Sequence, residues 1–245
     1  MNRHQLLGES MSFLFNLKRH LSKGVLLVFC LSGTVLLGQM VAFTGKDSNP
    51  PDEFAFVALQ DIADGTQIFF TESDYDNTAG TFSTATGGTE GTVMFTVSGT
   101  LTTGTVVQIS ETGVDTFTVT GNPGTATIVG SNSWSATSGD PHYAYSSSTP
   151  ASPWSDVDEI HAMIFATNAA FGTLDPSMGT FAFPNAIVVN NGFSGVIVAV
   201  DFTGDRMNAT HASLANSSNF TEGDGDLDLT AFGGVPVELM SVSIE

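Results

Sequence analysis

The stretch Thr116-Phe117-Thr118-Val119-Thr120 alternates hydroxyl and apolar side chains, and the turn signal Gly121-Asn122-Pro123-Gly124 follows it directly. Successive side chains of an extended strand point to opposite faces, so this alternation indicates a strand with one packed face and one wet face. A second β-rich run, Thr125–Val129, begins right after the turn. Two such runs joined by a glycine-containing link are typical of antiparallel sheets, and they favour an all-β fold.

The chain after residue 38 keeps this character. It is rich in Thr, Ser, Gly, Val and Phe, and poor in strong helix formers. Short apolar or alternating runs recur about every ten residues and are separated by turn signals such as Asp-Gly and Asn-Gly. The expected strands are 53–59, 66–71, 92–97, 105–110, Thr116–Thr120, Thr125–Val129, 142–145, 159–166, 186–190, 195–202, 227–232 and 235–244. This spacing is typical of a sandwich or barrel, and we expect an antiparallel β-sandwich, Ig-like or jelly-roll-like.

One short α-helix is expected near 205–217. Residues on one side of it recur at three- and four-residue steps, namely Met207, His211, Leu214 and Ala215. Either Thr203 or Asp205 can cap its start, and the polar run 216–219 ends it. Because no long linker interrupts the sequence, we expect a single domain over 39–245.

The first 38 residues differ chemically from the rest. They hold four of the six basic residues, and these precede a 13-residue apolar run from Val25 to Leu37. A cationic start, an apolar stretch of this length and a small residue such as Gly38 are the features of a secretory signal. We therefore expect a signal peptide over 1–38, cleaved between Gly38 and Gln39. The alternatives are a retained anchor, which needs about 20 apolar residues, and lipid attachment at Cys30.

Charge restricts the class of partner. Beyond residue 38 the chain has 24 acidic side chains against two basic ones, a formal charge of −22. Such a surface repels phosphate backbones and anionic lipids, which argues against nucleic-acid binding and against membrane insertion after signal cleavage. It attracts divalent cations, and it also suits salty surroundings. Cys30 is the single cysteine, so its removal with the signal excludes disulfides and thiol chemistry.

Three stretches resemble a family of exported β-rich domains that is common in Bacteroidota surface proteins. The first is Val41-Ala42-Phe43-Thr44-Gly45 together with 52–72, and the second is Ser135-Ala136-Thr137-Ser138-Gly139-Asp140 with Ala144-Tyr145. The third, Val235-Pro236-Val237-Glu238-Leu239-Met240-Ser241, is similar to the segment that often precedes the sorting domain of type IX secretion cargo. The resemblance implies an extracellular β-sandwich and no settled activity. We expect a secreted or cell-surface protein, on the bacterial outer surface or in the periplasm.

The densest acidic run, 222–228, is the main metal candidate. Calcium takes six to eight oxygen ligands, and alternating carboxylates in a glycine-rich loop can supply three or four of them. The candidate calcium ligands are Glu222, Asp224, Asp226 and Asp228. The run lacks the EF-hand pattern, since Leu229 stands where glycine is required, and a solvated acidic turn is the alternative. The segments 74–77 and 156–159 are lesser acidic candidates, and no cofactor other than calcium is expected.

Aromatic side chains gather around the central segment 130–155, which is rich in Ser, Pro and Gly. Exposed aromatic rings stack on sugars or anchor protein partners, so the candidate ligand-binding residues are Trp134, Tyr143 and Trp154. The alternative is that Trp134 and Trp154 close the open end of the sandwich.

Signals of catalysis are weak. The sequence has no Gly-x-Ser-x-Gly elbow, and His142, His161 and His211 lack the spacing of a zinc site. We interpret His161 and His211 as structural. The sequence therefore predicts an exported, non-enzymatic interaction or structural module, stiffened by calcium, whose partner is an extracellular glycan or a surface protein. The alternatives are a carbohydrate-binding or adhesion module that uses the loop aromatics, and a secreted hydrolase.

Overall fold

The computed structural model describes residues 39–76, 79–82, 90–130, 133–135, 140–164, 186–189, 199–223 and 226–234. All of them belong to one compact unit, Gly38–Glu245. The expected signal peptide over 1–38 and the expected strand over 235–244 lie outside the described residues. Within these ranges we find no helix with the length and hydropathy of a membrane span.

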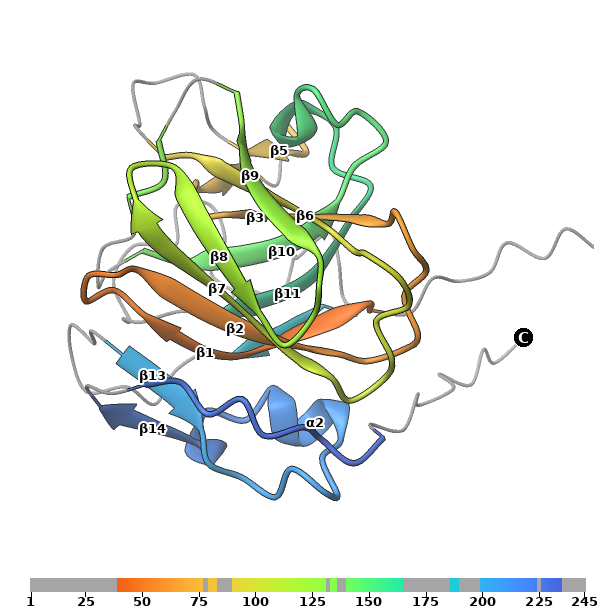
Figure 1. Cartoon of the computed structure of the whole chain (residues 1–245), viewed down its shortest axis with the longest axis vertical. Helices are drawn as coiled ribbons and strands as arrows, with labels where there is room; N and C mark the ends of the chain where they lie inside the picture. Colours follow the sequence, from red (N-terminus) through yellow and green to blue (C-terminus); the bar gives the residue numbers. More distant parts are fainter. Residues whose placement is uncertain are drawn as a thin grey trace, which may run out of the picture. The chain divides into compact units, whose positions relative to one another are not determined.

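Two six-stranded sheets dominate the described part of the chain (Figure 1). Sheet 1 has the order β14 (Phe220–Gly223), β13 (Ala199–Phe202), β1 (Val41–Asp47), β2 (Glu53–Ala58), β7 (Val106–Gly113) and β8 (Thr116–Thr120). Sheet 2 has the order β12 (Ile187–Val189), β11 (Glu159–Ile164), β10 (His142–Ser146), β3 (Gln67–Thr71), β6 (Thr92–Thr96) and β9 (Thr125–Val129). Only β11 and β12 pair in parallel among the described strand pairs. The predicted all-β sandwich with antiparallel sheets is confirmed.

The main core lies between the sheets. Residues two apart on one strand share a face, and the inward faces carry phenyl rings, such as Phe54 and Phe56 on β2 and Phe70 on β3. The ring centroid of Phe70 lies 4.7 Å from that of Phe54 and 5.0 Å from that of Phe56. These separations fall in the favourable range for aromatic pairs, so the rings fix how the two sheets pack.

A second, smaller core covers the other face of sheet 2. It contains Phe69, Tyr75, Phe82, Tyr143, Tyr145, Ile160 and Met163. The short hairpin of β4 (Tyr75–Asp76) and β5 (Thr81–Phe82) lies over this face, next to the 3-10 turn η1 (Pro153–Ser155). Strands β3, β10 and β11 are therefore buried on both faces, which explains why they read as continuous apolar runs in the sequence.

The sheets meet at one corner. Strands β8 and β9 are the last strands of sheet 1 and sheet 2, and they lie side by side (Figure 1). The link 121–124 joins them, and Gly121 adopts φ +95 in a position where a Cβ would strike the Val106 carbonyl. The exposed threonines of β8 alternate with the half-buried Phe117 and Val119, as the sequence predicts.

The predicted helix near 205–217 is shorter than expected. α2 spans His211–Leu214, and a 3-10 turn, η3 (Ser217–Asn219), follows it. The cap is Thr210, whose hydroxyl accepts from Ser213 N while the Ser213 hydroxyl accepts from Thr210 N. Asp205 instead accepts from Met207 N and Asn208 N. Its carboxylate thus holds a local turn, and the helix begins six residues later, at His211.

Two further differences concern strands. The sequence predicts a strand over 227–232, but this segment is irregular in the structure, and the prediction is wrong. Its apolar residues Leu227 and Phe232 are buried against the main core without joining a sheet. β1 and β14 lie outside the expected strands. Both pair with β13, so sheet 1 has two more strands beside β13 than the polar and apolar alternation of the sequence predicts.

Candidate functional site

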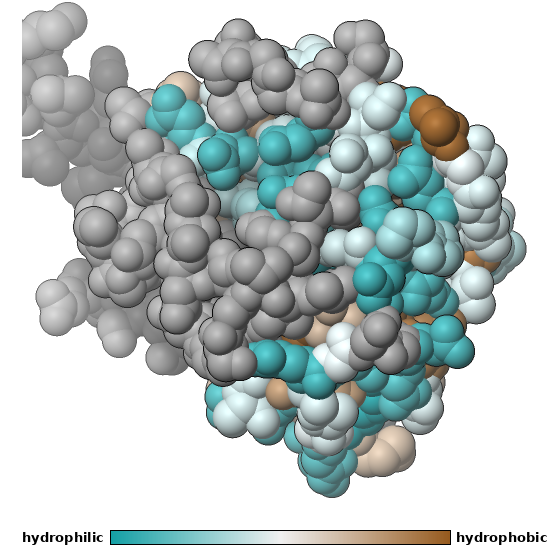
Figure 2. Space-filling model, turned by 90° about the vertical axis from the view of Figure 1, so that its left-hand side faces the viewer, coloured by the Kyte–Doolittle hydropathy of each residue, from teal (hydrophilic) through white to brown (hydrophobic). Residues whose placement is uncertain are grey.

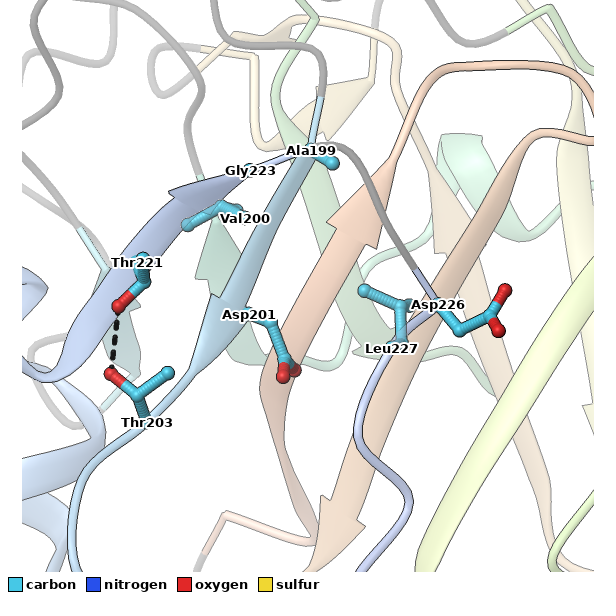
Figure 3. Close-up of a pocket in the computed structure, with 8 residues that line it drawn as sticks. All are labelled: Ala199, Val200, Asp201, Thr203, Thr221, Gly223, Asp226 and Leu227. Carbon is cyan, nitrogen blue, oxygen red and sulfur yellow. Dashed lines mark hydrogen bonds between the residues drawn. The ribbon is translucent and has the colours of Figure 1, made fainter.

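An open groove lies between β13, β14 and the segment 226–227 (Figure 3). It encloses about 270 Å³ and is lined by Ala199, Val200, Asp201, Thr203, Thr221, Gly223, Asp226 and Leu227. Thr221 is the register partner of Asp201, which places both side chains on one face of the strand pair. The hydroxyls of Thr203 and Thr221 are 2.9 Å apart and hydrogen-bonded. The groove combines the buried apolar side chains of Ala199 and Leu227 with the Thr203 and Thr221 hydroxyls and the Asp201 carboxylate.

Asp201 is the half-buried carboxylate of this groove. Its side chain points into the space between β13 and Leu227 (Figure 3). Burial raises its pKa, while the hydrogen bond from Asp228 N and the Arg206 guanidinium oppose this increase. The distance from Asp228 N to Asp201 Oδ2 is 3.2 Å. Asp201 therefore connects the strand to the segment that forms the opposite wall.

Arg206 fixes that wall to the sheet. Its Nε lies 3.2 Å from Asp228 Oδ2, and its NH2 lies 3.7 Å from Asp201 Oδ1. The guanidinium also donates to the carbonyls of Phe202 and Thr230, at 2.9 Å and 3.1 Å. It stacks over the Phe232 ring with 4.8 Å between Cζ and the centroid. A planar, multiply bonded guanidinium of this kind is a rigid structural contact.

The predicted calcium ligands are spread out in the structure. Glu222 is on β14, Asp226 is on the groove wall, and the Asp228 carboxylate pairs with Arg206 and accepts from Thr230 N. Asp224 lies outside the described residues. No three His, Cys, Asp or Glu side chains in the described ranges are placed to hold a metal ion as they stand. Calcium binding by this run stays a prediction.

The three predicted aromatic ligand-binding residues do not share a surface. Trp134 is 4% exposed and Tyr143 is fully buried, so these two rings are inside the molecule. The Trp134 ring stacks on Phe54 at 5.4 Å between centroids. Trp154 is half-buried and packs close to Gly130. The structure thus agrees with the alternative interpretation of Trp134, in which this ring closes one end of the sandwich.

A second group of ionisable side chains, absent from the sequence-based candidates, lies inside one end of the sandwich. We call it the buried ionic cluster, and its central members are Lys46, Glu72 and His142. Each is at most 1% exposed. Lys46 Nζ donates to the Asp140 carbonyl at 2.8 Å, and Glu72 Oε1 accepts from Ser135 N at 2.8 Å. Glu72 follows β3 with the same parity as Ile68 and Phe70, so it faces the inter-sheet core.

Burial perturbs the charge states in this cluster. It raises the pKa of Glu72 to about 8, and the neighbouring Asp140 and Glu90 carboxylates add to this, while the Ser135 hydrogen bond and Lys46 oppose it. Burial also lowers the pKa of Lys46 to about 8. Burial and Lys46 hold the pKa of His142 well below its usual range. At neutral pH, Glu72 and His142 are therefore mainly uncharged while Lys46 remains cationic.

The other two histidines were predicted to be structural. His161 is buried on β11, and burial lowers its pKa to about 4. Neither of its ring nitrogens has a hydrogen-bond partner in the described part of the chain. His211 is the first residue of α2, as the predicted helix requires.

Comparisons of the chain with models of protein families, with curated proteins and with solved structures found no match. The resemblance to exported β-rich domains therefore stays a prediction.

Proposed function

We propose that this chain is an exported, non-enzymatic interaction module that binds a cationic surface of a protein partner in the groove beside β13 and β14. The observation that supports the proposal most is the chemistry of the lining. Apolar side chains form its buried part, the Asp201 carboxylate lies on the β13 wall, and Asp226 belongs to the facing wall with its carboxylate directed away from Asp201 (Figure 3). Lysine and arginine side chains have an apolar stem and a charged head, and this combination matches such a groove.

Long-range charge favours the same class of partner. Residues 39–245 carry 24 acidic and two basic side chains, and Arg206, one of those two, is already held by Asp228. An anionic surface attracts basic partners and increases their association rate. On the face shown in Figure 2, the described residues are mostly hydrophilic, and apolar side chains occur in separate places. Recognition through charge is therefore better supported than recognition through an extended apolar patch.

The scaffold suits a binding role. The strand β13 is hydrogen-bonded to β1 on one side and β14 on the other, and the Arg206 contacts fix the facing wall. Binding to a preorganised groove costs less ordering entropy than binding to a loose loop.

The experiment measures binding of the full-length protein to lysine- and arginine-rich peptides immobilised on a sensor. We expect saturable binding that weakens as salt is added, because exposed charge pairs are screened. Thr221→Arg places a cationic side chain in the groove and should abolish binding. Thr118→Arg is the matched control, since Thr118 is an exposed threonine on β8 of the same sheet.

Equal binding by both variants would refute the groove as the site. A glycan array run in parallel tests the carbohydrate-binding alternative. Saturable glycan binding that Thr221→Arg leaves intact would favour that alternative over the present proposal. Turnover of generic ester or glycoside substrates would favour the hydrolase.

A further inference from the structure

Asp201 occupies the middle of one row of side-chain positions across sheet 1. In the register of the sheet, Gly45 of β1 lies opposite it on one side and Thr221 of β14 lies opposite it on the other. Residues paired across neighbouring strands share a face, and the strands are about 4.8 Å apart. The Asp201 carboxylate therefore stands between a bare stretch of backbone and a hydroxyl group.

The glycine at position 45 makes room for an apolar wall beside this carboxylate. A Cβ at Gly45 would lie 2.8 Å from Leu227 Cδ2 and 3.1 Å from Asp201 Oδ1. A methyl group and a carboxylate thus approach the same point of β1 from two sides. A ligand that contacts both needs an apolar stem next to a charged head, which is the build of a basic side chain.

One side of the carboxylate faces the groove. Asp201 Oδ1 is shielded from solvent and has no hydrogen-bond partner among the described residues, while the side chain as a whole is 25% exposed. Oδ2 accepts from Asp228 N at 3.2 Å. A carboxylate oxygen has two lone pairs, so Oδ2 can accept one more hydrogen bond. A ligand in the groove therefore meets a single acceptor position of Asp201 and not the pair of oxygens.

The negative charge of Asp201 is available to a ligand. The Arg206 guanidinium lies between two carboxylates, but its Nε is 3.2 Å from Asp228 Oδ2 whereas its NH2 is 3.7 Å from Asp201 Oδ1. The longer distance exceeds that of a hydrogen bond, and the same NH2 donates to the Phe202 carbonyl at 2.9 Å. Arg206 is thus paired with Asp228. A cationic head can gain a charge-assisted hydrogen bond at Asp201 without displacing that pair.

We propose that the groove holds one lysine ammonium group of the partner against Asp201 Oδ2 and selects lysine over arginine. This inference rests on the proposed function and names the side chain that the groove binds. The strong mode of arginine is a planar fork that needs both oxygens of a carboxylate, and here Oδ1 is buried. An ammonium group is a compact point charge that needs one acceptor at a time. Its stem lies along Leu227.

The test compares three peptides that differ only in their basic side chains, which are lysine, arginine or Nε-acetyl-lysine. Binding of the full-length protein to each immobilised peptide is measured at one constant salt concentration. We expect the lysine peptide to have the lowest dissociation constant and the arginine peptide to bind at least about fivefold more weakly, as for the loss of one hydrogen bond. Acetylation removes the charge, so the acetylated peptide should show no saturable binding.

Asp201→Asn tests the residue itself. Asparagine keeps an oxygen that can accept from Asp228 N but loses the charge. Lysine binding should weaken at least about tenfold, and the preference over arginine should disappear. Asp226→Asn is the matched control, because the Asp226 carboxylate is directed away from Asp201 (Figure 3). It should keep both the affinity and the preference.

Failure of this inference is distinguishable from failure of the proposed function. If no basic peptide binds the wild type, the proposed function fails and the inference fails with it. If basic peptides bind and Thr221→Arg abolishes that binding, but arginine binds as tightly as lysine, the proposed function stands and the inference is overturned. Equal losses in Asp226→Asn and Asp201→Asn would also overturn it. The comparison of peptides on the wild type needs no variant, so it decides the question even if Asp201→Asn does not fold.

Discussion

Replacement of Glu72 by glutamine should stabilise the protein at neutral pH in the presence of chelator. Glutamine has the shape of the protonated acid, stays uncharged, and keeps an oxygen that accepts from Ser135 N. The folded protein holds the Glu72 proton up to a pKa of about 8, whereas the unfolded chain releases it near 4.5. Because the folded pKa of this acid is raised, the contribution of Glu72 to stability is fully present below pH 4.5. It is lost as the pH rises towards 8.

The magnitude follows from linkage. Each pKa unit corresponds to about 1.4 kcal/mol, so Glu72 costs the wild type about 3 kcal/mol between pH 4.5 and 7 and about 4 kcal/mol by pH 8. The Lys46 pKa of about 8 lies above the first window, so Lys46 stays charged throughout it. The free-energy difference between Glu72→Gln and wild type should thus be near zero at pH 4.5 and about 3 kcal/mol in favour of the variant at pH 7.

Urea denaturation at these two pH values, followed by tryptophan fluorescence, measures this difference. Trp134 is a suitable reporter because its ring is buried against Phe54 and His142. Glu222→Gln, on the exposed strand β14, is the surface control and should show no change over the same range. A Glu72→Gln protein that is less stable than wild type at pH 7 would refute the reasoning, because Glu72 would then be ionised and well paired in the folded state.

Three further predictions concern the rest of the molecule. Arg206→Met removes the contacts to Asp228 and to the Phe202 and Thr230 carbonyls, which hold the segment that contains Phe232. Hydrogen exchange at Phe232 N, which donates to the Gly104 carbonyl, should therefore accelerate. Arg206→Lys should not restore the slow exchange, because lysine lacks the planar guanidinium. Gly104→Ala should destabilise the protein by more than about 1 kcal/mol in urea melts, because Gly104 has φ +84 and a Cβ there would strike the Phe232 carbonyl. The control is Gly99→Ala, which should cost only the strain of a positive φ because nothing lies within 4 Å of its Cβ. As the pH falls from 6.5 to 4, the free energy of unfolding should decrease less for His161→Leu than for the wild type. The pKa of His161 is about 4 in the folded protein, so the unfolded chain binds the His161 proton at a higher pH, and this costs the wild type about 3 kcal/mol. Equal loss of stability in acid for the two proteins would contradict this prediction.

Alternation of polar and apolar residues in the sequence predicts the strands that have one solvent-exposed face. The strands Thr116–Thr120 and Thr125–Val129 occur with the expected bounds because their threonines are exposed at the sandwich corner. The segment 227–232 has a similar apolar content, but its side chains pack over the fold without a strand partner. Pairing is a tertiary property, and alternation within six residues cannot report it.

The groove and the ionic cluster differ in how far sequence reveals them. The acidic run 222–228 suggests calcium ligands and not a groove, although Asp226 and Leu227 line the groove wall in the structure. Lys46 and Glu72 are 26 positions apart and meet only because β1 and β3 face each other across the core. The one local signal is a glutamate directly after the apolar run Ile68-Phe69-Phe70-Thr71, with the parity of the inward residues.

The β8–β9 corner decides where a foreign strand can join this protein. At an ordinary sheet edge, unpaired backbone groups invite strand addition and fibril growth. Here the terminal strands of both sheets abut each other, and their outward side chains are short hydroxyl groups. Among the described strands, the borders that remain for recruitment of another chain are β14 and β12.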